Sequence, residues 1–364
     1  MTTHFFTGYP GFLGGRLVPR VLERDPTARA VCLVQEKFIK LAESRLAELR
    51  LADPDLADRV DLVEGDITRP DLGLDEAAER GAREAIEIWH LAAIYDLSVT
   101  REVGLRVNLE GTQNVLSLAA RCPDLNRFHH VSTCYVSGRY SGVFSEEDLE
   151  KGQTFNNCYE ETKFLAEVAV REAAAGGLPT TVYRPAIVVG DSRTGETQKY
   201  DGPYFILRWV LKQPGGVALV PVVGDPDATR VNLVPSDFVI EAIAHLSTLP
   251  HASGRTYQLA DPDPPTVSGM LDVIERSTGK RLRRVSLPRK TAKWAIDRVP
   301  GVYRLTGIPS GAVDYFAHPT HYSVHQASTD LAGSGVTVPA FETYADRLVR
   351  YLRDHPEVGS SAMT

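Results

Sequence analysis

Long hydrophobic runs are missing from this chain of 364 residues. No apolar stretch approaches the ~18 residues that a membrane-spanning helix requires, so we expect no membrane span. Residues Met1–His4 lead directly into a β-prone segment, which leaves no room for a secretion signal. These absences lead us to expect a cytoplasmic protein.

Cysteines are few, and their spacing indicates no joint function. The four are Cys32, Cys122, Cys134 and Cys158. They form no C-x-x-C pair and have no histidine at a metal-ligand spacing, so we expect free thiols and no metal site. Cys134 and Cys158 each adjoin a candidate catalytic residue, where packing of a small side chain is favoured over covalent thiol chemistry.

An excess of basic residues is missing as well. Lysine and arginine total 40 against 47 acidic residues, for a net charge of −7, which excludes nucleic acid as the main partner. The segment 280–293 departs from this balance, with seven basic residues: Lys280, Arg281, Arg283, Arg284, Arg289, Lys290 and Lys293. Its charge suits the phosphates of CoA or a carrier protein, although a solvated strand and helix face is the more ordinary explanation.

The N-terminal segment has a pattern typical of dinucleotide binding. The β-prone run Thr3–Thr7 precedes a helical apolar pattern, and between them lies the turn Gly8, Tyr9, Pro10, Gly11, Phe12, Leu13 and Gly14. In such a unit Gly8 permits the tight turn, Gly11 lets the backbone approach a pyrophosphate, and Gly14 lets the helix pack near the strand. The helix N-terminus then faces the phosphates. We expect the whole turn to contact a dinucleotide.

A second motif pairs Tyr159 with Lys163. Because they are four residues apart, the two side chains lie on one face of a helix. A free phenol titrates near pH ~10, and a nearby ammonium favours the phenolate. The pair therefore suits proton transfer at a carbonyl oxygen.

Together these motifs resemble the extended short-chain dehydrogenase/reductase superfamily. Further landmarks follow in that superfamily's order: Gly65-Asp66-Ile67, His90-Leu91-Ala92-Ala93, Asn108 before Glu110-Gly111-Thr112, Ser132-Thr133, and Tyr183-Arg184-Pro185. The resemblance implies a catalytic set of Thr133, Tyr159 and Lys163, with Asn108 as its structural asparagine. It also implies that the cofactor touches Asp66, Ile67, Ala92, Ala93, Tyr159, Lys163 and Pro185.

The expected fold is α/β, a Rossmann-type doubly wound parallel sheet with a smaller C-terminal substrate lobe. We expect an NAD(P)-binding domain over 1–190 and a mixed substrate lobe over 191–358 that partly returns to the sheet near 230–260. Residues 359–364 are expected to be a disordered tail. Two polar, glycine-containing stretches, 140–157 and 191–203, read as loops.

Cofactor preference depends on the end of the second expected strand. An acidic residue there favours NAD and an arginine favours NADP. Gln35 is neither, Glu36 favours NAD, and Lys37 and Lys40 favour NADP. The resemblance favours NADP(H) over NAD(H). We expect Gln35 and Lys37 to be among the cofactor contacts.

The substrate is indicated mainly by resemblance. The strings around Phe12-Leu13-Gly14, Val131-Ser132-Thr133 and Tyr183 to Ser192 are similar to thioester reductases, fatty acyl-CoA reductases and carboxylic acid reductase domains, although Gln35 stands where those enzymes usually carry arginine. Arg230 and Asp237 keep the spacing of a substrate-side pair. We expect substrate contacts at Tyr95, Cys134, Tyr135, Tyr204 and Arg230, with Tyr200, Phe205 and Trp209 as further aromatic candidates.

The predicted function is NAD(P)(H)-dependent hydride transfer to a carbonyl, best an acyl thioester or a hydrophobic aldehyde or ketone. The acyl group would be carried by CoA or a carrier protein. A hydroxysteroid-type ketone reductase and a nucleotide-sugar epimerase or dehydratase would use the same residues, and Arg230 fits the latter. A dinucleotide-sensing binding protein is the non-enzyme alternative, and a homodimer is compatible with all of these.

Overall fold

The computed structural model describes residues 2–95, 99–299 and 310–359. Its centre is a parallel seven-stranded sheet in the order β11-β7-β5-β4-β1-β2-β3. The strands are β1 Thr2–Thr7, β2 Ala28–Val34, β3 Val60–Glu64, β4 Ala85–His90, β5 Arg127–Val131, β7 Thr180–Pro185 and β11 Thr256–Leu259. The order reverses at β1, and this confirms the doubly wound Rossmann-type fold expected from the sequence.

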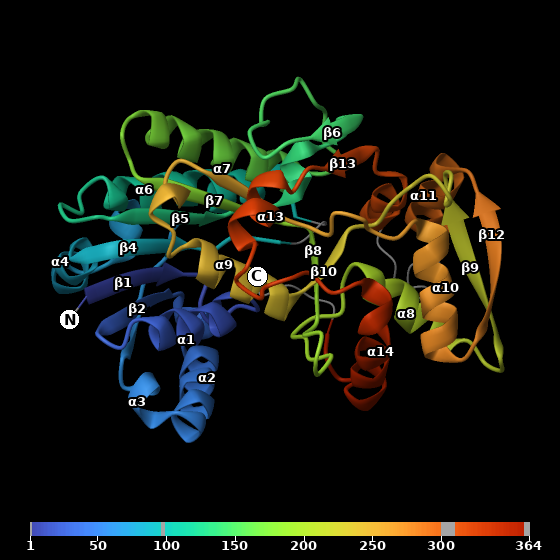
Figure 1. The fold of residues 1–364 in the computed structure, drawn as a ribbon, viewed down its shortest axis with the longest axis horizontal. Coiled ribbons are helices and arrows are strands. Elements are labelled where there is room, and N and C mark those ends of the chain that lie inside the picture. The colour runs from blue at the N-terminus through green and yellow to red at the C-terminus, as the bar shows by residue number, and fades with distance from the viewer. Residues whose placement is uncertain (1, 96–98, 300–309, 360–364) are drawn as a thin grey trace.

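Helices cover both faces of the sheet (Figure 1). They are α1 Gly14–Arg24, α2 Ile39–Ala52, α3 Pro54–Ala57, α4 Glu76–Arg83, α5 Arg101–Gly104, the π-helical turn η3 Leu105–Glu110, α6 Gly111–Ala119, α7 Cys158–Ala175 and α9 Ser236–Leu246. Short 3₁₀ turns are η1 Glu36–Phe38, η2 Pro70–Gly73, η4 Cys134–Ser137, η5 Pro250–Ala252 and η7 Phe341–Thr343. No helix in the described ranges has the length and hydrophobicity needed to cross a bilayer.

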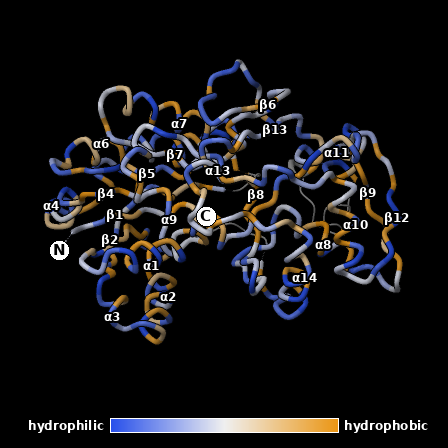
Figure 2. Tube along the Cα trace, viewed as in Figure 1, coloured by the Kyte–Doolittle hydropathy of each residue, from blue (hydrophilic) through white to orange (hydrophobic). Residues whose placement is uncertain are grey.

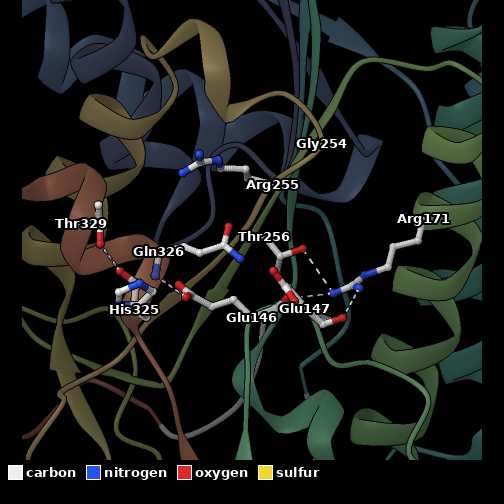
Figure 3. Close-up of a pocket in the computed structure, with 9 residues that line it drawn as sticks. All are labelled: Glu146, Glu147, Arg171, Gly254, Arg255, Thr256, His325, Gln326 and Thr329. Carbon is white, nitrogen blue, oxygen red and sulfur yellow. Dashed lines mark hydrogen bonds between the residues drawn. The ribbon is translucent and has the colours of Figure 1, made fainter.

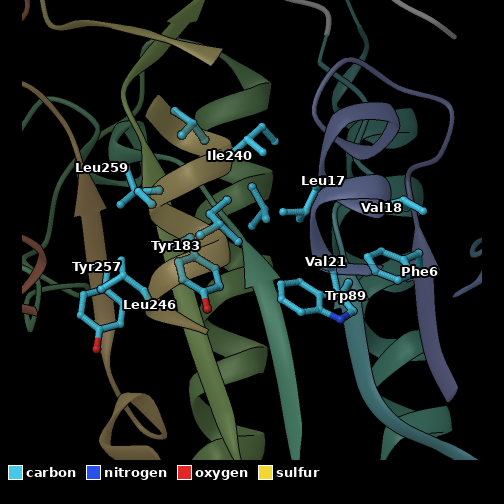
Figure 4. Packing of buried hydrophobic residues seen from close by; sticks show 14 of the residues in the cluster. Phe6, Leu17, Val18, Val21, Trp89, Tyr183, Ile240, Leu246, Tyr257 and Leu259 are labelled. Carbon is cyan, nitrogen blue, oxygen red and sulfur yellow. The ribbon is translucent and has the colours of Figure 1, made fainter. Parts of the chain in front are cut away.

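Neighbouring strand residues supply the cores on opposite faces of the sheet. Phe5 packs with α6, whereas Phe6 packs with α1, as the alternation of a strand requires. Figure 4 shows the core that contains Phe6. In it the rings of Phe6, Trp89, Tyr183 and Tyr257 form a row facing α1 and α9. Both cores consist of buried, mostly apolar side chains, although the middle strands also bury polar residues such as His129, His130 and Thr181.

A second lobe is built from later residues. It contains α8 Pro203–Lys212, β9 Val217–Val223, α10 Val267–Thr278, β12 Arg281–Leu287, α11 Arg289–Arg298, the 3₁₀ segment η6 Ser310–Ala317 and α14 Ala345–Asp354. Helices α8, α10 and α14 share one core with the buried side of β9. This lobe lies to the right of the central sheet in Figure 1.

Parts of the chain after 190 return to the first lobe. β10 Leu233–Pro235 pairs with β8 Ile187–Val189, β11 extends the central sheet beside β7, and α9 packs on α1. The expected return near 230–260 is thus present. The helix α13 His325–Leu331 also packs there. Of the expected tail, residues 360–364 lie outside the described residues.

The stretch 140–157 is not entirely a loop, contrary to expectation. It contains β6 Gly142–Phe144, which pairs in parallel with β13 Thr320–Tyr322. A strand of three residues whose partner lies so far along the chain leaves no local periodicity to detect. The stretch 191–203 does lack regular structure until α8 begins at Pro203.

Candidate active site

The glycine turn lies between β1 and α1, at the edge of a cavity of about 1220 Å³ that both lobes line. Gly8 has φ +93°, and a Cβ there would approach the Ala92 amide nitrogen to 2.8 Å. A Cβ at Gly11 would lie 2.8 Å from the Gly8 carbonyl oxygen, and one at Gly14 would collide with the same oxygen. The backbone therefore forms a cradle without side chains, as a pyrophosphate at a helix N-terminus requires.

Two details of this turn differ from the sequence interpretation. The absence of a side chain at Gly14 makes room for the Gly8 carbonyl, which closes the turn. The sequence interpretation gave the packing of α1 on β1 as the reason for this glycine. A side chain at Gly11 would likewise distort the turn before it reached a phosphate. Six residues of the turn line the cavity, namely Gly8, Tyr9, Gly11, Phe12, Leu13 and Gly14, whereas Pro10 does not.

The far end of the cavity is lined by Gln35, Lys37, Asp66 and Ile67, all expected cofactor contacts. Burial raises the pKa of Asp66, but hydrogen bonds from Thr68 and Gln35 outweigh it and keep the carboxylate ionised. Arg45 on α2 also lines the cavity and was missed. The helical spacing of Phe38, Leu41 and Arg45, which share the cavity wall, is the signal that would have found it.

His90 fixes the loop that faces the glycine turn. Its Nδ1 lies 2.8 Å from the Thr7 hydroxyl and its Nε2 lies 2.9 Å from the Thr112 hydroxyl. The Thr7 hydroxyl in turn accepts a hydrogen bond from the Ala92 amide at 3.2 Å. The imidazole thereby holds Ala92 and Ala93 where they line the cavity.

Asn108 is buried in η3 and does not line the cavity. Its Oδ1 accepts from the Ile94 amide at 2.8 Å, and its Nδ2 donates to the Thr162 hydroxyl at 2.9 Å. These bonds tie the loop before Tyr95 to the helix that carries Tyr159 and Lys163. Asn108 is therefore a positioning residue, and its placement with the catalytic set is corrected.

Thr133, Tyr159 and Lys163 meet on the wall of the cavity. Thr133 follows β5, and its hydroxyl donates to the Pro185 carbonyl at 3.4 Å and lowers the pKa of Tyr159. Asn157 caps α7 by accepting from the Glu160 amide at 3.0 Å, and Tyr159 and Lys163 follow on this helix. The Lys163 ammonium donates to the Val131 carbonyl at 2.9 Å. The three residues that the sequence motifs proposed as catalytic are thus brought together by β5 and α7.

Burial dominates the titration of the pair. It raises the pKa of Tyr159 well above the ordinary phenol value, and the Thr133 hydrogen bond offsets only part of this. Burial also lowers the pKa of Lys163 to about 8. The interpretation of Lys163 as the group that depresses the pKa of Tyr159 is therefore wrong for this arrangement. A protonated phenol at neutral pH is the form required of a proton donor.

A buried ion pair holds the strand ends behind the catalytic residues. The Arg184 guanidinium lies 2.6 Å from the Glu167 carboxylate, and neither side chain is exposed. Glu167 also accepts from the Ser132 hydroxyl at 2.6 Å. Burial raises the pKa of Glu167, but the charge of Arg184 outweighs it and keeps the pKa low. The pair joins β7 to α7 and fixes the residue that precedes Thr133.

The cavity continues past Tyr159 between the two lobes. The Tyr95 ring meets the Tyr159 ring edge-on, with centroids 4.9 Å apart, and Tyr135 meets Tyr315 in the same way at 4.7 Å. Much of the remaining wall is apolar: Ile94, Val107, Pro185, Ile187, Val188, Phe205, Val231, Met270 and Phe316. It also includes the ion pair of Lys199 and Asp201, 3.0 Å apart. An elongated apolar group fits this end.

Three expected substrate residues lie elsewhere. Cys134 is fully buried behind the wall, where its thiol donates to the Arg184 carbonyl. Tyr204 is also buried, and its hydroxyl accepts from the Gly190 amide at 2.9 Å. Arg230 pairs with Asp263 at 2.7 Å instead of with Asp237. Of the further aromatic candidates, Phe205 lines the cavity, whereas Tyr200 and Trp209 do not.

A second, smaller hollow of about 580 Å³ lies between α7, β11 and α13 (Figure 3). Its charged groups serve the structure. Arg171 donates to the carbonyl of Glu147 at 2.8 Å, and Arg255 pairs with Asp330 at 2.7 Å. The Glu146 carboxylate accepts from the Ala327 amide at 2.9 Å. Because Arg171, Arg255 and Glu146 make these internal contacts, we take the large cavity as the candidate active site.

Known proteins resemble the chain along most of its length. The family model described as male sterility protein, an NAD-binding family, matches residues 6–243. A linear gramicidin synthase from Brevibacillus parabrevis is 28% identical over 292 residues, which is 77% of this chain and 6% of that protein. Fatty acyl-CoA reductase wat of Drosophila melanogaster is 26% identical over 274 residues, covering 66% of this chain and 52% of the reductase. The chain thus spans a small part of the synthase and about half of the reductase.

A solved structure of another protein has a similar fold. The terminal R domain from the myxalamid PKS-NRPS biosynthetic pathway superposes with a TM-score of 0.83 at 27% identity. The superposition covers 98% of this chain and 92% of that domain. The similarity therefore extends over both lobes.

Proposed function

Because the chain belongs to the male sterility protein family, we propose that it reduces an acyl thioester carried on CoA or a carrier protein. The chain is an NAD(P)-dependent oxidoreductase of the extended short-chain dehydrogenase/reductase superfamily. The observation that carries the substrate proposal is one cavity lined by the glycine turn, by Thr133 and Tyr159, and by a largely apolar wall. The fatty acyl-CoA reductase and the synthase among the relatives support it.

The residues present fit a bound dinucleotide. A cofactor in the cradle supplies a hydride to the carbonyl carbon, and it is oxidised as the thioester is reduced. Thr133 donates a hydrogen bond to the carbonyl oxygen, and Tyr159 donates the proton that this oxygen needs. In this proposal Lys163 would hold the nicotinamide ribose. The resulting hemithioacetal collapses to an aldehyde and a free thiol, so the balance is one hydride and one proton for each thioester cleaved.

A screen with NADPH tests the proposal. We expect absorbance at 340 nm to fall with long-chain acyl thioesters and a thiol to be released in equal amount. Ketones without thiol release would indicate the hydroxysteroid-type reductase, and turnover of UDP-sugars the epimerase. The epimerase reading loses its support from Arg230, which pairs with Asp263 outside the cavity. Cofactor binding without any turnover would indicate a sensing protein.

NADP(H) is the proposed cofactor, and Lys37 and Arg45 are the residues proposed to meet its 2′-phosphate. Both line the cavity near Gln35. A charge-assisted contact is worth ~1.5–3 kcal/mol, so the double change Lys37→Ala, Arg45→Ala should weaken NADPH roughly 10- to 100-fold or more and leave NADH nearly unchanged. Fluorescence titration of both cofactors measures this.

The matched control for the cofactor test is Lys40→Ala. Lys40 is exposed close to Lys37 in sequence but does not line the cavity. Its change should leave both affinities alone. Equal losses for NADPH and NADH in the double variant, or a wild type that prefers NADH, would contradict the proposed preference.

A further inference from the structure

β9 and β12 form a two-stranded parallel sheet at the end of the molecule away from the central sheet (Figure 1). The register sets Val217 beside Arg281, Leu219 beside Arg283, and Pro221 beside Val285. Alternate residues point inward, where Ala218, Val220 and Leu282 join the core of the second lobe. The two-stranded sheet is therefore packed on one side only.

Its outer side, the docking face, consists of Val217, Leu219, Pro221, Arg281, Arg283 and Val285. Val217 is 50% exposed, Leu219 is 55% exposed and Val285 is 44% exposed. In Figure 2 the traces of β9 and β12 carry both hydrophobic and hydrophilic positions. Aliphatic side chains grouped in this way are unusual for a merely solvated face and are typical of an interaction site.

The basic segment that includes this face is mostly occupied by internal contacts. Lys280 donates to the carbonyl of Leu211 at 3.2 Å. Arg284 pairs with Asp272, and Lys293 reaches Asp314 at 2.7 Å. Arg289 lies 3.9 Å from the same aspartate. Four of the seven basic residues in this segment therefore hold the fold together.

The charges that remain available lie largely on the docking face. Among the described residues, Arg281 and Arg283 have no ion-pair or side-chain hydrogen-bond partner. The face has no acidic member, although the chain as a whole carries −7. An acidic partner is repelled by most of this protein, so its approach is favourable at a local basic face.

The docking face is connected to the wall of the active cavity. β12 is followed by α11, which is held to η6 by the contact between Lys293 and Asp314. Tyr315 and Phe316 of η6 line the cavity. The segment η6 therefore links α11, which follows β12, to the wall of the cavity. Trp294 on α11 is 60% exposed and adds apolar area to that side.

We propose that the docking face binds an acidic carrier protein, which delivers the acyl thioester on its flexible arm; this rests on the proposed function. CoA alone matches the face less well. Its phosphates would use the two arginines, but three exposed aliphatic side chains spread over two strands suit an apolar protein surface. The arginines at the face give the encounter its charge complementarity, and the aliphatic centre excludes water.

The test compares one acyl group on two supports. The substrates are octanoyl-loaded acyl carrier protein and octanoyl-N-acetylcysteamine, and the variant is Arg281→Glu, Arg283→Glu. We expect KM for the carrier-linked thioester to rise ~10- to 100-fold, with kcat/KM for the small thioester unchanged within about twofold. Raising the salt concentration should weaken the wild type in the same selective way. A second variant, Leu219→Ser, should raise the carrier KM without altering charge.

The control reverses two exposed arginines at the opposite end of the molecule, Arg50→Glu and Arg80→Glu, and should leave both substrates unaffected. If the small thioester is reduced but the face variants keep the carrier KM, the docking proposal is wrong and the function stands. The docking proposal is also wrong if the wild type has no higher kcat/KM for the carrier-linked thioester than for the small thioester. If neither thioester is reduced, the function itself fails and the docking proposal falls with it. A wild-type dimer that the variant converts to monomer in sedimentation would instead assign the face to a second copy.

Discussion

Replacing Tyr159 by phenylalanine is expected to lower turnover by a factor on the order of 10²–10⁴. The change removes the hydroxyl that donates the proton and nothing else from the cavity wall. The ring contact with Tyr95, with centroids 4.9 Å apart, does not require that hydroxyl. Fold and cofactor affinity should therefore survive, which circular dichroism and NADPH titration can check.

Two neighbouring variants sharpen the result for Tyr159. Thr133→Val should lower turnover with little effect on cofactor affinity, because the proposed mechanism uses its hydroxyl to bind the substrate oxygen. Lys163→Ala should reduce both, since the proposed mechanism also has Lys163 hold the nicotinamide ribose. Near-normal turnover of Tyr159→Phe on the best thioester from the screen would remove the catalytic interpretation of this motif, and dinucleotide binding would have to stand alone.

Replacing Arg184 by methionine is expected to lower the free energy of unfolding by ~3–5 kcal/mol, the usual cost of breaking a buried ion pair from one side. The variant leaves Glu167 without its closest cation, 2.6 Å away, in a place where neither side chain is exposed. Urea denaturation measures the loss. Turnover should fall too, because Glu167 holds Ser132 next to Thr133.

An exposed ion pair supplies the control for Arg184. The Arg101 side chain is 57% exposed and meets Glu161 at 2.7 Å, also on α7. Arg101→Met should lower the free energy of unfolding far less than Arg184→Met does, because water replaces the lost contact. A loss at Arg184 as small as that at Arg101 would mean that the core repacks around Glu167 without strain.

Features encoded within a few residues could be predicted from the sequence. The turn from Gly8 to Gly14 lies between a strand and a helix, as its spacing indicates, and Tyr159 and Lys163 face one cavity because four residues make one helical turn. The parallel sheet followed from alternating strand and helix patterns. Each of these features is a consequence of local periodicity and backbone geometry.

Features that depend on contacts between distant segments could not be predicted. Tyr315 and Phe316 line the substrate end because η6 packs against the first lobe. No local sequence pattern predicts this packing. Tyr204 looked equally suitable but is core, since composition does not separate a lining ring from a buried one. Arg230 and Asp237 have the spacing of a pair, yet Asp237 accepts instead from the Ser192 hydroxyl at 2.6 Å.

The return of α9 and β11 to the central sheet has a consequence for synthesis on the ribosome. When residues up to 190 have emerged, β7 is still an open edge and the part of α1 that packs on α9 is uncovered, because β11 and α9 are not yet made. The first lobe is therefore complete only after β11 and α9 have been translated. Until residue 259 is free of the exit tunnel, its unpaired strand edge is open to wrong partners.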